Sequence, residues 1–223
     1  MKPIEARDLS FSYFSSPRVL RGVNLEVERG EIVFIKGKTG SGKTTLLYAL
    51  SGIIPHLVGG RMKGEVKLLG RKTMEREFNE LAKRIGVVMQ NPEMHFVGIP
   101  LIEELKIKAM NMGMGEGEAE RRAAEVLEEL KAVNLARRLP DSLSGGQKQI
   151  AAFALAVVHE PEVLFLDEPL SNLDVRRREI VKKYIERIAE EGRCAVIAER
   201  RTFTSGRVLV LKNGRVVSES DRG

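Results

Sequence analysis

Residues 37–44 read Gly37-Lys38-Thr39-Gly40-Ser41-Gly42-Lys43-Thr44 and decide the fold. The stretch fits the pattern G-x-x-x-x-G-K-[ST], and it connects the apolar run 32–35, which predicts a strand, to residues 43–51, which predict a helix. Glycines let backbone N–H groups point at phosphate oxygens, and a helix N-terminus adds a partial positive charge. The sequence therefore predicts a phosphate-binding loop in an α/β fold. A glycine-rich turn that contains Lys and Thr by chance is the alternative, and the strand–helix context counts against it.

The side chains of this loop indicate a nucleoside triphosphate bound together with Mg²⁺. Lys43 is expected to reach the β- and γ-phosphates, and Thr44 is expected to offer its hydroxyl to Mg²⁺. We expect residues 37–44 and the following Thr45 to bind the nucleotide. GTPases, kinases and helicases share this loop, so the rest of the chain must choose among these chemistries.

Strand and helix patterns alternate along the chain, with one long helical interruption. Strands are predicted at 4–13, 19–28, 32–35, 65–69, 85–89, 163–166, 194–198, 208–211 and 216–218. Between 91 and 161 the strand pattern vanishes, and helices are predicted near 101–110, 118–132 and 145–159. We expect a single domain over 1–223. Its α/β core with a mixed sheet comprises 1–90 and 161–223, with an antiparallel β part near the start, and a helical subdomain is inserted at 91–160.

Composition narrows the function classes. Of the 223 residues, 43% are hydrophobic, yet the longest apolar runs, such as 150–158, fall far short of the roughly 20 residues of a membrane-spanning helix. The N-terminus lacks the apolar segment of a secretory signal, so we expect a cytoplasmic protein whose membrane role comes through a partner. The net charge is +6, but the Lys and Arg residues are interspersed with acidic residues along the chain, which indicates a solvated surface.

Cysteine and histidine offer no metal site. Cys194 is the only cysteine and lies in an apolar stretch, so we expect a buried structural thiol, and disulfides are excluded. None of His56, His95 and His159 lies at ligand spacing from another His or Cys. We expect these three histidines on the surface or in loops.

A second motif is specific. Leu143-Ser144-Gly145-Gly146-Gln147 precedes the helical run 148–159, with Ser144 placed as an N-cap. This pentapeptide resembles the signature motif of ABC ATPases, and further motifs follow in that family's order over nearly the whole chain. The resemblance implies the ABC-type P-loop NTPase fold, ATP and Mg²⁺ as ligands, and ATPase activity. It also implies a head-to-tail dimer in which Ser144, Gly145, Gly146 and Gln147 contact the ATP held by the partner's phosphate-binding loop.

The segment Val163-Leu164-Phe165-Leu166-Asp167-Glu168-Pro169 resembles the Walker B strand and catalytic glutamate of the same family. Asp167 is expected to hold Mg²⁺ or its waters. Glu168 is expected to orient and deprotonate the attacking water. Two acids at an ordinary solvated strand end are the alternative.

Three more positions receive roles from the resemblance. Gln90 ends a predicted strand and resembles the Q-loop glutamine, which contacts Mg²⁺ and the water and hinges the helical subdomain. Asp174, in Ser171-Asn172-Leu173-Asp174, resembles the D-loop aspartate at the dimer seam, although a helix-capping turn also explains it. Tyr13 lies where the family carries an aromatic that stacks on adenine. A plain strand aromatic is the alternative for Tyr13.

The sequence departs from the family at the switch histidine, which follows the strand after Walker B. Here Glu199-Arg200-Arg201 follows the predicted strand 194–198, and Arg200 occupies the histidine position. An arginine can stabilise negative charge on the γ-phosphate but cannot shuttle a proton. Hydrolysis that is intact, slowed or lost is compatible with this change.

Within the family the chain is most similar to the ATPases of energy-coupling-factor importers of vitamins and transition-metal ions. The resemblance rests on Gly52-Ile53-Ile54-Pro55-His56-Leu57 and on Gln90-Asn91-Pro92-Glu93 with Phe96-Val97, whereas Met94 and His95 depart from it. It implies a second ATPase subunit, in a homodimer or a heterodimer, a transmembrane subunit, and a peripheral location on the inner face of the cell membrane. A helix of that subunit is expected in a groove lined by Met94, Phe96, Val97 and Ile99. Packing of these side chains inside the helical subdomain is the alternative.

Three functions compete at this stage. The first is the hydrolysing motor of an importer. The second is a module that dimerises on ATP but hydrolyses little of it because of Arg200. The third is a non-transport ABC protein that acts on nucleic acid, but such proteins usually carry coiled-coil insertions or two fused ATPase domains. Neither feature is present in the sequence, so no nucleic-acid partner is expected.

Overall fold

Ten strands and seven helices make up the part of the chain that the computed structural model describes, residues 2–14 and 16–220. The strands are β1 (Ile4–Ser12), β2 (Leu20–Val27), β3 (Ile32–Lys36), β4 (Arg61–Leu68), β5 (Arg71–Lys72), β6 (Ile85–Val88), β7 (Val163–Asp167), β8 (Cys194–Ala198), β9 (Arg207–Lys212) and β10 (Arg215–Ser220). The helices are α1 (Lys43–Ser51), α2 (Ile53–His56), α3 (Phe78–Ala82), α4 (Leu101–Asn111), α5 (Glu116–Glu129), α6 (Gly145–Val157) and α7 (Val175–Glu190).

A mixed six-stranded sheet in the order β10-β9-β3-β8-β7-β6 forms the centre. The strands β3, β6, β7, β8 and β9 pair in parallel, whereas β10 pairs antiparallel to β9. The predicted mixed sheet is confirmed. Because parallel strands end at a common edge, the segments that follow β3, β6, β7 and β8 meet there.

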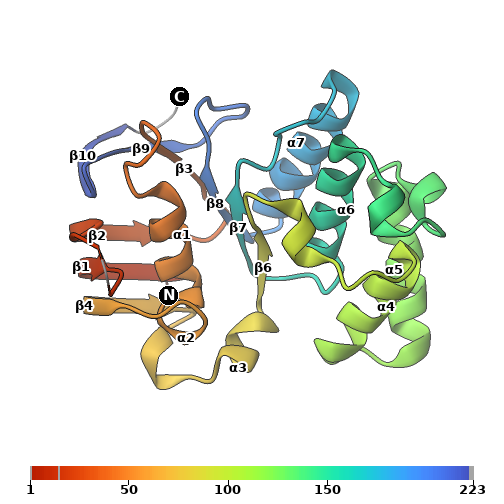
Figure 1. Cartoon of the computed structure of the whole chain (residues 1–223), viewed down its shortest axis with the longest axis horizontal. Helices are drawn as coiled ribbons and strands as arrows, with labels where there is room; N and C mark the ends of the chain where they lie inside the picture. Colours follow the sequence, from red (N-terminus) through yellow and green to blue (C-terminus); the bar gives the residue numbers. More distant parts are fainter. Residues whose placement is uncertain (1, 15, 221–223) are drawn as a thin grey trace.

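A second, antiparallel sheet has the order β2-β1-β4-β5 and confirms the predicted antiparallel part. Figure 1 shows β1, β2 and β4 side by side, with α1 between them and the central strands. The side chains of β1 that pack inward, among them Ile4, Leu9 and Phe11, are fully buried.

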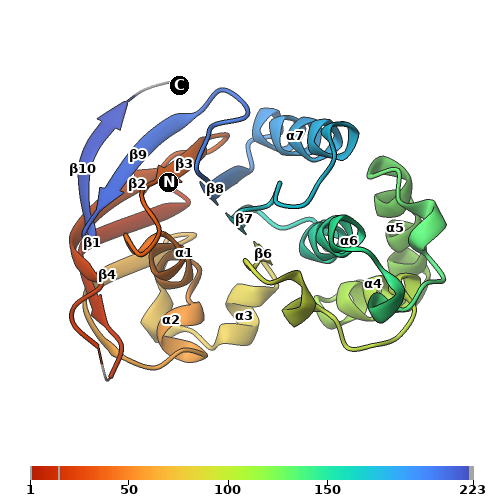
Figure 2. The same ribbon diagram turned by 45° about the horizontal axis from the view of Figure 1, so that its top comes forward.

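Side chains along the central strands point alternately to the two faces of the sheet, and each face packs into its own hydrophobic core. Val33 and Ile35 of β3 belong to the core that includes α1 and the antiparallel sheet. Ile32 and Phe34 of the same strand belong to the core that includes α4 to α7. A period of two along a strand that is covered on both faces produces this division. Figure 2 shows α1 on one side of the central strands and α6 and α7 on the other.

The helices α4, α5 and α6 lie between β6 and β7 in the chain, and α4 and α5 stand at the end of the molecule opposite β1, β2 and β4 (Figure 1). This helical insertion is confirmed as part of the fold. The predicted helix at 43–51 and strand at 194–198 are observed with the same bounds, and the other predicted elements shift by a few residues. No helix among the described residues is long and apolar enough to cross a membrane.

Helix α7 and the short elements α2, α3 and β5 were not predicted from the sequence. The signal for α7 was available, because its buried residues Val181, Tyr184, Ile185 and Ile188 recur at helical spacing. Asp174 caps this helix by accepting a hydrogen bond from the backbone N–H of Arg177 at 2.8 Å.

Candidate active site

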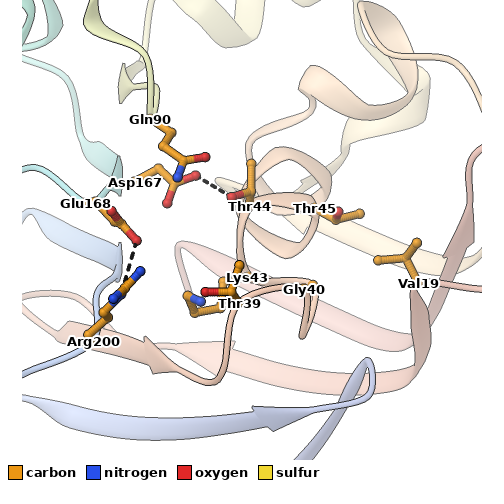
Figure 3. A pocket seen from close by; sticks show the side chains of 11 residues that line it. Val19, Thr39, Gly40, Lys43, Thr44, Thr45, Gln90, Asp167, Glu168 and Arg200 are labelled. Atoms are coloured by element: carbon orange, nitrogen blue, oxygen red, sulfur yellow. Dashed lines mark hydrogen bonds and ion pairs between the residues drawn. The ribbon is translucent and has the colours of Figure 1, made fainter.

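A cavity of about 230 Å³ opens at the carboxyl edge of the central sheet. Five segments line it: Val19 before β2, the loop after β3 with the start of α1, Gln90 after β6, Asp167 and Glu168 at the end of β7, and Arg200 after β8. Figure 3 shows these side chains converging on one space from opposite sides. The structure therefore brings together the predicted side chains of Lys43, Thr44, Gln90, Asp167, Glu168 and Arg200.

The loop between β3 and α1 has the backbone shape that phosphate binding requires. Gly42 is the N-cap of α1 with a φ of 105° and offers no side chain to cap the helix, so the first-turn N–H groups have no side-chain acceptor there. A Cβ on Gly37 would lie 2.4 Å from the carbonyl oxygen of Leu211. The Nζ of Lys43 curls back over the loop and donates to the carbonyl oxygens of Gly37, at 3.0 Å, and Lys38, at 3.4 Å. The loop is an anion cradle with a cation inside it.

The side chains of Thr44 and Asp167 meet at the wall of the cavity. The hydroxyl of Thr44 donates to Oδ2 of Asp167 at 2.5 Å (Figure 3). Asp167 is only 2% exposed, and burial raises its pKa, with the hydrogen bond from Thr44 opposing that effect. A buried carboxylate beside a hydroxyl and the side chain of Gln90 supplies the oxygen ligands that Mg²⁺ prefers. The donor set fits Mg²⁺, whereas no cluster of three or more His, Cys, Asp or Glu suited to a metal occurs among the described residues.

Glu168 is held in an uncommon backbone conformation, with a φ of 49°. Its N–H donates to the carbonyl oxygen of Ala198 on β8 at 2.9 Å. On the other side, the fully buried Gln149 of α6 donates from its amide to the carbonyl oxygens of Glu168, at 3.4 Å, and Pro169, at 3.2 Å. These contacts fix the position of Glu168 relative to the cavity. The role of Gln149 was not predicted from the sequence, although a glutamine directly before the apolar run 150–158 is a usable signal for a buried polar side chain.

Arg200 reaches toward Glu168 from the neighbouring strand end. Its Nε lies 3.9 Å from Oε1 of Glu168, and its side chain is 70% exposed (Figure 3). Burial raises the pKa of the adjacent Glu199, whose carboxylate accepts a hydrogen bond from the backbone N–H of Arg200 at 2.8 Å. The predicted position of Arg200 at this site is observed.

Tyr13 lies beside the cavity but does not line it; Val19 does. The Tyr13 hydroxyl and the Thr45 hydroxyl are hydrogen-bonded at 3.0 Å, and the Tyr13 ring meets Phe11 edge-on at 4.9 Å between centroids. This placement leaves its expected contact with adenine a prediction.

The signature segment lies away from this cavity, since none of residues 144–147 lines it. Ser144 caps α6 as predicted: its side chain accepts from the backbone N–H of Gln147, and the Gln147 side chain accepts from the N–H of Ser144. A Cβ on Gly146 would lie 2.5 Å from the carbonyl oxygen of Asn172, so the start of α6 packs against the loop 171–174 of the same chain.

The loop after Gln90 mixes exposed and packed apolar side chains. Met94 is 67% and Val97 is 78% exposed, whereas Phe96 packs against the core of α4 to α6. The buried carboxylate of Glu104 accepts hydrogen bonds from the N–H groups of residues 97–99 and shapes the loop. The expectation of an apolar cluster at 94–99 therefore holds for only part of that set.

Of the three histidines expected on the surface or in loops, His159 does lie in the turn after α6, but it is not on the surface: it is 7% exposed and bonded through Nε2 to the carbonyl oxygen of Ile85 at 2.9 Å. His95 is half-buried, and its Nε2 accepts from the N–H of Met89 at 2.9 Å. A His in an apolar helix end is buried because its ring packs while one nitrogen pairs with backbone. Cys194 is buried as predicted, and burial raises the pKa of its thiol to about 12.

The sequence is similar to ATP-binding proteins of ABC transporters. The family model described as ABC transporter matches residues 20–171. A putative ABC transporter ATP-binding protein of Pyrococcus abyssi is 37% identical, over 98% of this chain and 80% of the relative. The energy-coupling factor transporter ATP-binding protein EcfA of Methanothermobacter thermautotrophicus is 34% identical, over 97% of this chain and 70% of the relative.

Two solved structures resemble the fold closely. A dimeric ATP-binding cassette, MJ0796, in a post-hydrolysis state bound to ADP and Pi superimposes with a TM-score of 0.84 and 26% identity, covering 98% of each chain. CbiO1 of Clostridium perfringens, described as part of the ABC transporter complex CbiONQ, has a TM-score of 0.82 and 27% identity, covering 99% of this chain and 88% of CbiO1.

Proposed function

The chain belongs to the ABC transporter family as an ATP-binding cassette ATPase, and we propose that it is the motor subunit of an energy-coupling-factor type importer of vitamins or transition-metal ions. The observation that carries the proposal is the single cavity into which Lys43, Gln90, Asp167 and Glu168 converge from three strand ends. The resemblance to EcfA and CbiO1 over nearly the whole chain favours the importer branch.

The loop after β3 binds ATP. Residues 37–45 cradle the phosphates through backbone N–H groups, and Lys43 exchanges its two carbonyl contacts for the β- and γ-phosphate oxygens. Tyr13 supports the adenine end of the site next to Thr45. Thr44, Asp167 and Gln90 would hold Mg²⁺ or its waters, and the cation would supply charge neutralisation at the transferring phosphoryl group.

Cleavage of the terminal phosphate falls to Glu168, assisted by Gln90. Glu168 takes a proton from the attacking water, which it orients together with Gln90. The backbone contacts of Glu168 to Ala198 and Gln149 keep its carboxylate in place during this step. Arg200 takes the place of the switch histidine and stabilises negative charge on the γ-phosphate.

A second subunit completes the site. Residues 144–147 lie outside their own chain's cavity, and α6 begins at Gly145, so the N–H groups of Gly145 and Gly146, unlike that of Gln147, are left for an anion. We propose a head-to-tail homodimer or heterodimer in which Ser144, Gly145, Gly146 and Gln147 of one chain contact the ATP of the other, with Asp174 at the seam. The dimeric state described for MJ0796 supports this arrangement.

The loop after Gln90 couples ATP hydrolysis to transport. We propose that residues 91–160 form a subdomain that rotates about Gln90 against the core of 1–90 and 161–223. A cytoplasmic helix of a transmembrane subunit docks beside the exposed Met94 and Val97 at the inner face of the cell membrane. An ion pair between Glu93 and Lys148 of α6 links this loop to the signature helix.

The second candidate function is a module that dimerises on ATP and hydrolyses little of it. Arg200 favours this candidate, because it lines the cavity where we place the switch histidine, and a permanently charged guanidinium cannot shuttle a proton.

Steady-state phosphate release by the isolated chain, with Mg²⁺ and ATP, distinguishes the two functions. Turnover that depends on ATP concentration supports the motor. ATP-dependent dimerisation in size-exclusion chromatography without phosphate release supports the module. Failure to bind ATP at all would contradict both.

A further inference from the structure

Helix α6 contacts the loop that follows β7 at two places in the same chain. At the start of the helix, a Cβ on Gly146 would lie 2.5 Å from the carbonyl oxygen of Asn172. One turn further on, the amide of Gln149 donates to the carbonyl oxygens of Glu168, at 3.4 Å, and Pro169, at 3.2 Å. Figure 2 shows α6 beside β7 and α7, the two elements that this loop joins. The first two turns of α6 therefore pack as one unit with the loop.

The hydrogen bonding of Gln149 is one-sided. Its side chain is fully buried, and its NH₂ group donates to the two carbonyl oxygens. Its Oε1 is buried without a hydrogen-bond partner among the described residues. An unpaired buried acceptor lowers stability, so an apolar side chain of the same length would suit this position better if packing were its only role. The amide of Gln149 therefore points to a role beyond packing.

The two carbonyl groups that Gln149 holds belong to the turn that carries the proposed general base. Glu168 has a φ of 49°, which few residues other than glycine adopt. Its carbonyl oxygen also accepts from the N–H of Ser171 at 3.0 Å, whereas the carbonyl oxygen of Pro169 accepts from Gln149 alone in the described part of the chain. A shift of this backbone would turn the Cα–Cβ bond of Glu168 and move its carboxylate relative to the γ-phosphate.

The start of the same helix serves the other ATP site of the proposed dimer. The N–H groups of Gly145 and Gly146 are left for the ATP that the partner holds. Gln149 follows within the same continuous helix of 13 residues, about 6 Å along the axis from its first residue. A displacement of the start of α6 is therefore carried to Gln149.

We propose that Gln149 is a positioning residue for ATP cleavage, through which α6 joins the two ATP sites of the dimer. When the partner's ATP engages the start of α6, Gln149 sets the backbone of Glu168 in its own chain's site. Gln149 does not line the ATP cavity, so it acts through Glu168. The inference rests on the proposed function, because it assumes the head-to-tail dimer and the role of Glu168 as the base.

The first measurement separates positioning from stability. Gln149→Met keeps the length of the side chain and removes both N–H donors. We expect kcat for phosphate release to fall by about 10-fold or more, the KM for ATP to change by less than about 3-fold, and the melting temperature to stay within about 4 °C of wild type. The control Thr73→Val removes another fully buried hydrogen bond, from Thr73 to the carbonyl oxygen of Val66, and should keep the wild-type kcat. A wild-type kcat in Gln149→Met would overturn the inference.

Mixed dimers show which ATP site Gln149 serves. A limiting reporter copy with intact Glu168 is premixed, without nucleotide, with a large excess of a silent copy that carries Glu168→Gln. Mg²⁺ and ATP then start a single turnover, in which the reporter copy's own site releases the phosphate. Gln149→Met in the reporter copy should slow this release by about 10-fold or more, whereas the same change in the silent copy should leave it unchanged.

The silent copy supplies the start of α6 to the reporting site. Equal slowing by Gln149→Met in either copy would therefore mean that the substitution acts through the shape of α6, and it would overturn the inference. An unchanged rate with Gln149→Met in the silent copy also shows that the variant folds and dimerises.

A double-mutant cycle in the reporter copy tests the link to the partner's ATP. Ser144→Ala alters the start of α6, which in the reporter copy faces the ATP of the silent copy. We expect Ser144→Ala to slow release by an otherwise unchanged reporter about 3-fold more than it slows release by a Gln149→Met reporter. Additive effects would overturn the link between the sites and leave the motor function standing. Absence of phosphate release from the unchanged reporter would overturn the proposed hydrolysis by this chain, and the inference with it.

Discussion

Nε of Arg200 lies 3.9 Å from Oε1 of Glu168, so the residue that we place at the switch-histidine position forms an ion pair with the proposed general base. The two residues follow adjacent parallel strands, β8 and β7, and Asp167 is in register with Ala198. Their side chains therefore meet at the wall of the same cavity.

Replacing Glu168 with Gln should preserve ATP binding and block cleavage, because the amide fills the same space but cannot accept a proton. We expect phosphate release to fall by about 100-fold or more and the variant to accumulate as an ATP-bound dimer in size-exclusion chromatography. Glu179→Gln, at an exposed position on α7, is the control and should keep wild-type turnover. Wild-type hydrolysis by Glu168→Gln would show that another group is the base.

Replacing Arg200 with Ala should slow phosphate release by about 10-fold or more, since one lost contact to transition-state charge corresponds to about 2.7 to 4 kcal/mol. Arg200→His should recover or raise the rate. Arg201→Ala is the matched control, because Arg201 does not line the ATP cavity. Faster phosphate release by Arg200→Ala would instead mean that Arg200 inhibits catalysis by Glu168. An unchanged rate would mean that the Arg200 side chain points away from the phosphate.

Replacing Gly146 with Ala should lower stability, because the added Cβ would lie 2.5 Å from the carbonyl oxygen of Asn172. We expect a loss of about 1 to 3 kcal/mol in the free energy of unfolding, measured by urea denaturation, and reduced ATP-dependent dimerisation. Gly117→Ala within α5 is the control, since open space surrounds that position. It should be neutral or stabilising by about 0.5 to 1 kcal/mol. Equal stability of the two variants would contradict the close packing of α6 on the loop 171–174.

Replacing Asp167 with Asn should raise the melting temperature of the nucleotide-free protein at pH 7.5. Burial raises the pKa of Asp167 in the folded state above the ordinary value of 3.8. A raised carboxyl pKa means that wild-type stability declines as pH rises through the folded-state pKa, whereas the amide does not ionise. The advantage of Asp167→Asn should therefore shrink below pH 3.8.

The same variant tests the magnesium site. Wild-type protein should gain melting temperature with Mg²⁺ and ATP, and Asp167→Asn should lose the Mg²⁺-dependent part of that gain. Asp141→Asn, at an exposed position outside the proposed site, is the control and should behave as wild type in both experiments. A full Mg²⁺-dependent shift in Asp167→Asn would place the cation elsewhere.

Much of the fold followed from local patterns. The side chains of Ile32–Lys36 point alternately into the two hydrophobic cores, and this apolar run before a glycine predicted a buried strand. Ser144 was recognisable as an N-cap because capping involves residues only three positions apart. In contrast, the burial of His159 depends on the carbonyl oxygen of Ile85, which is far away in the sequence.

The sequence by itself determined the phosphate-binding loop and the signature segment, because the residues that form each of them lie within a few positions of one another. The order of these motifs along the chain is likewise read directly from the sequence. Only the tertiary structure decided that Arg200 pairs with Glu168, that Gln149 holds the backbone of Glu168, and that His159 is buried against Ile85. These relationships join side chains from separate strands and helices. Their distances follow from how the layers pack, and packing is a property of the whole chain.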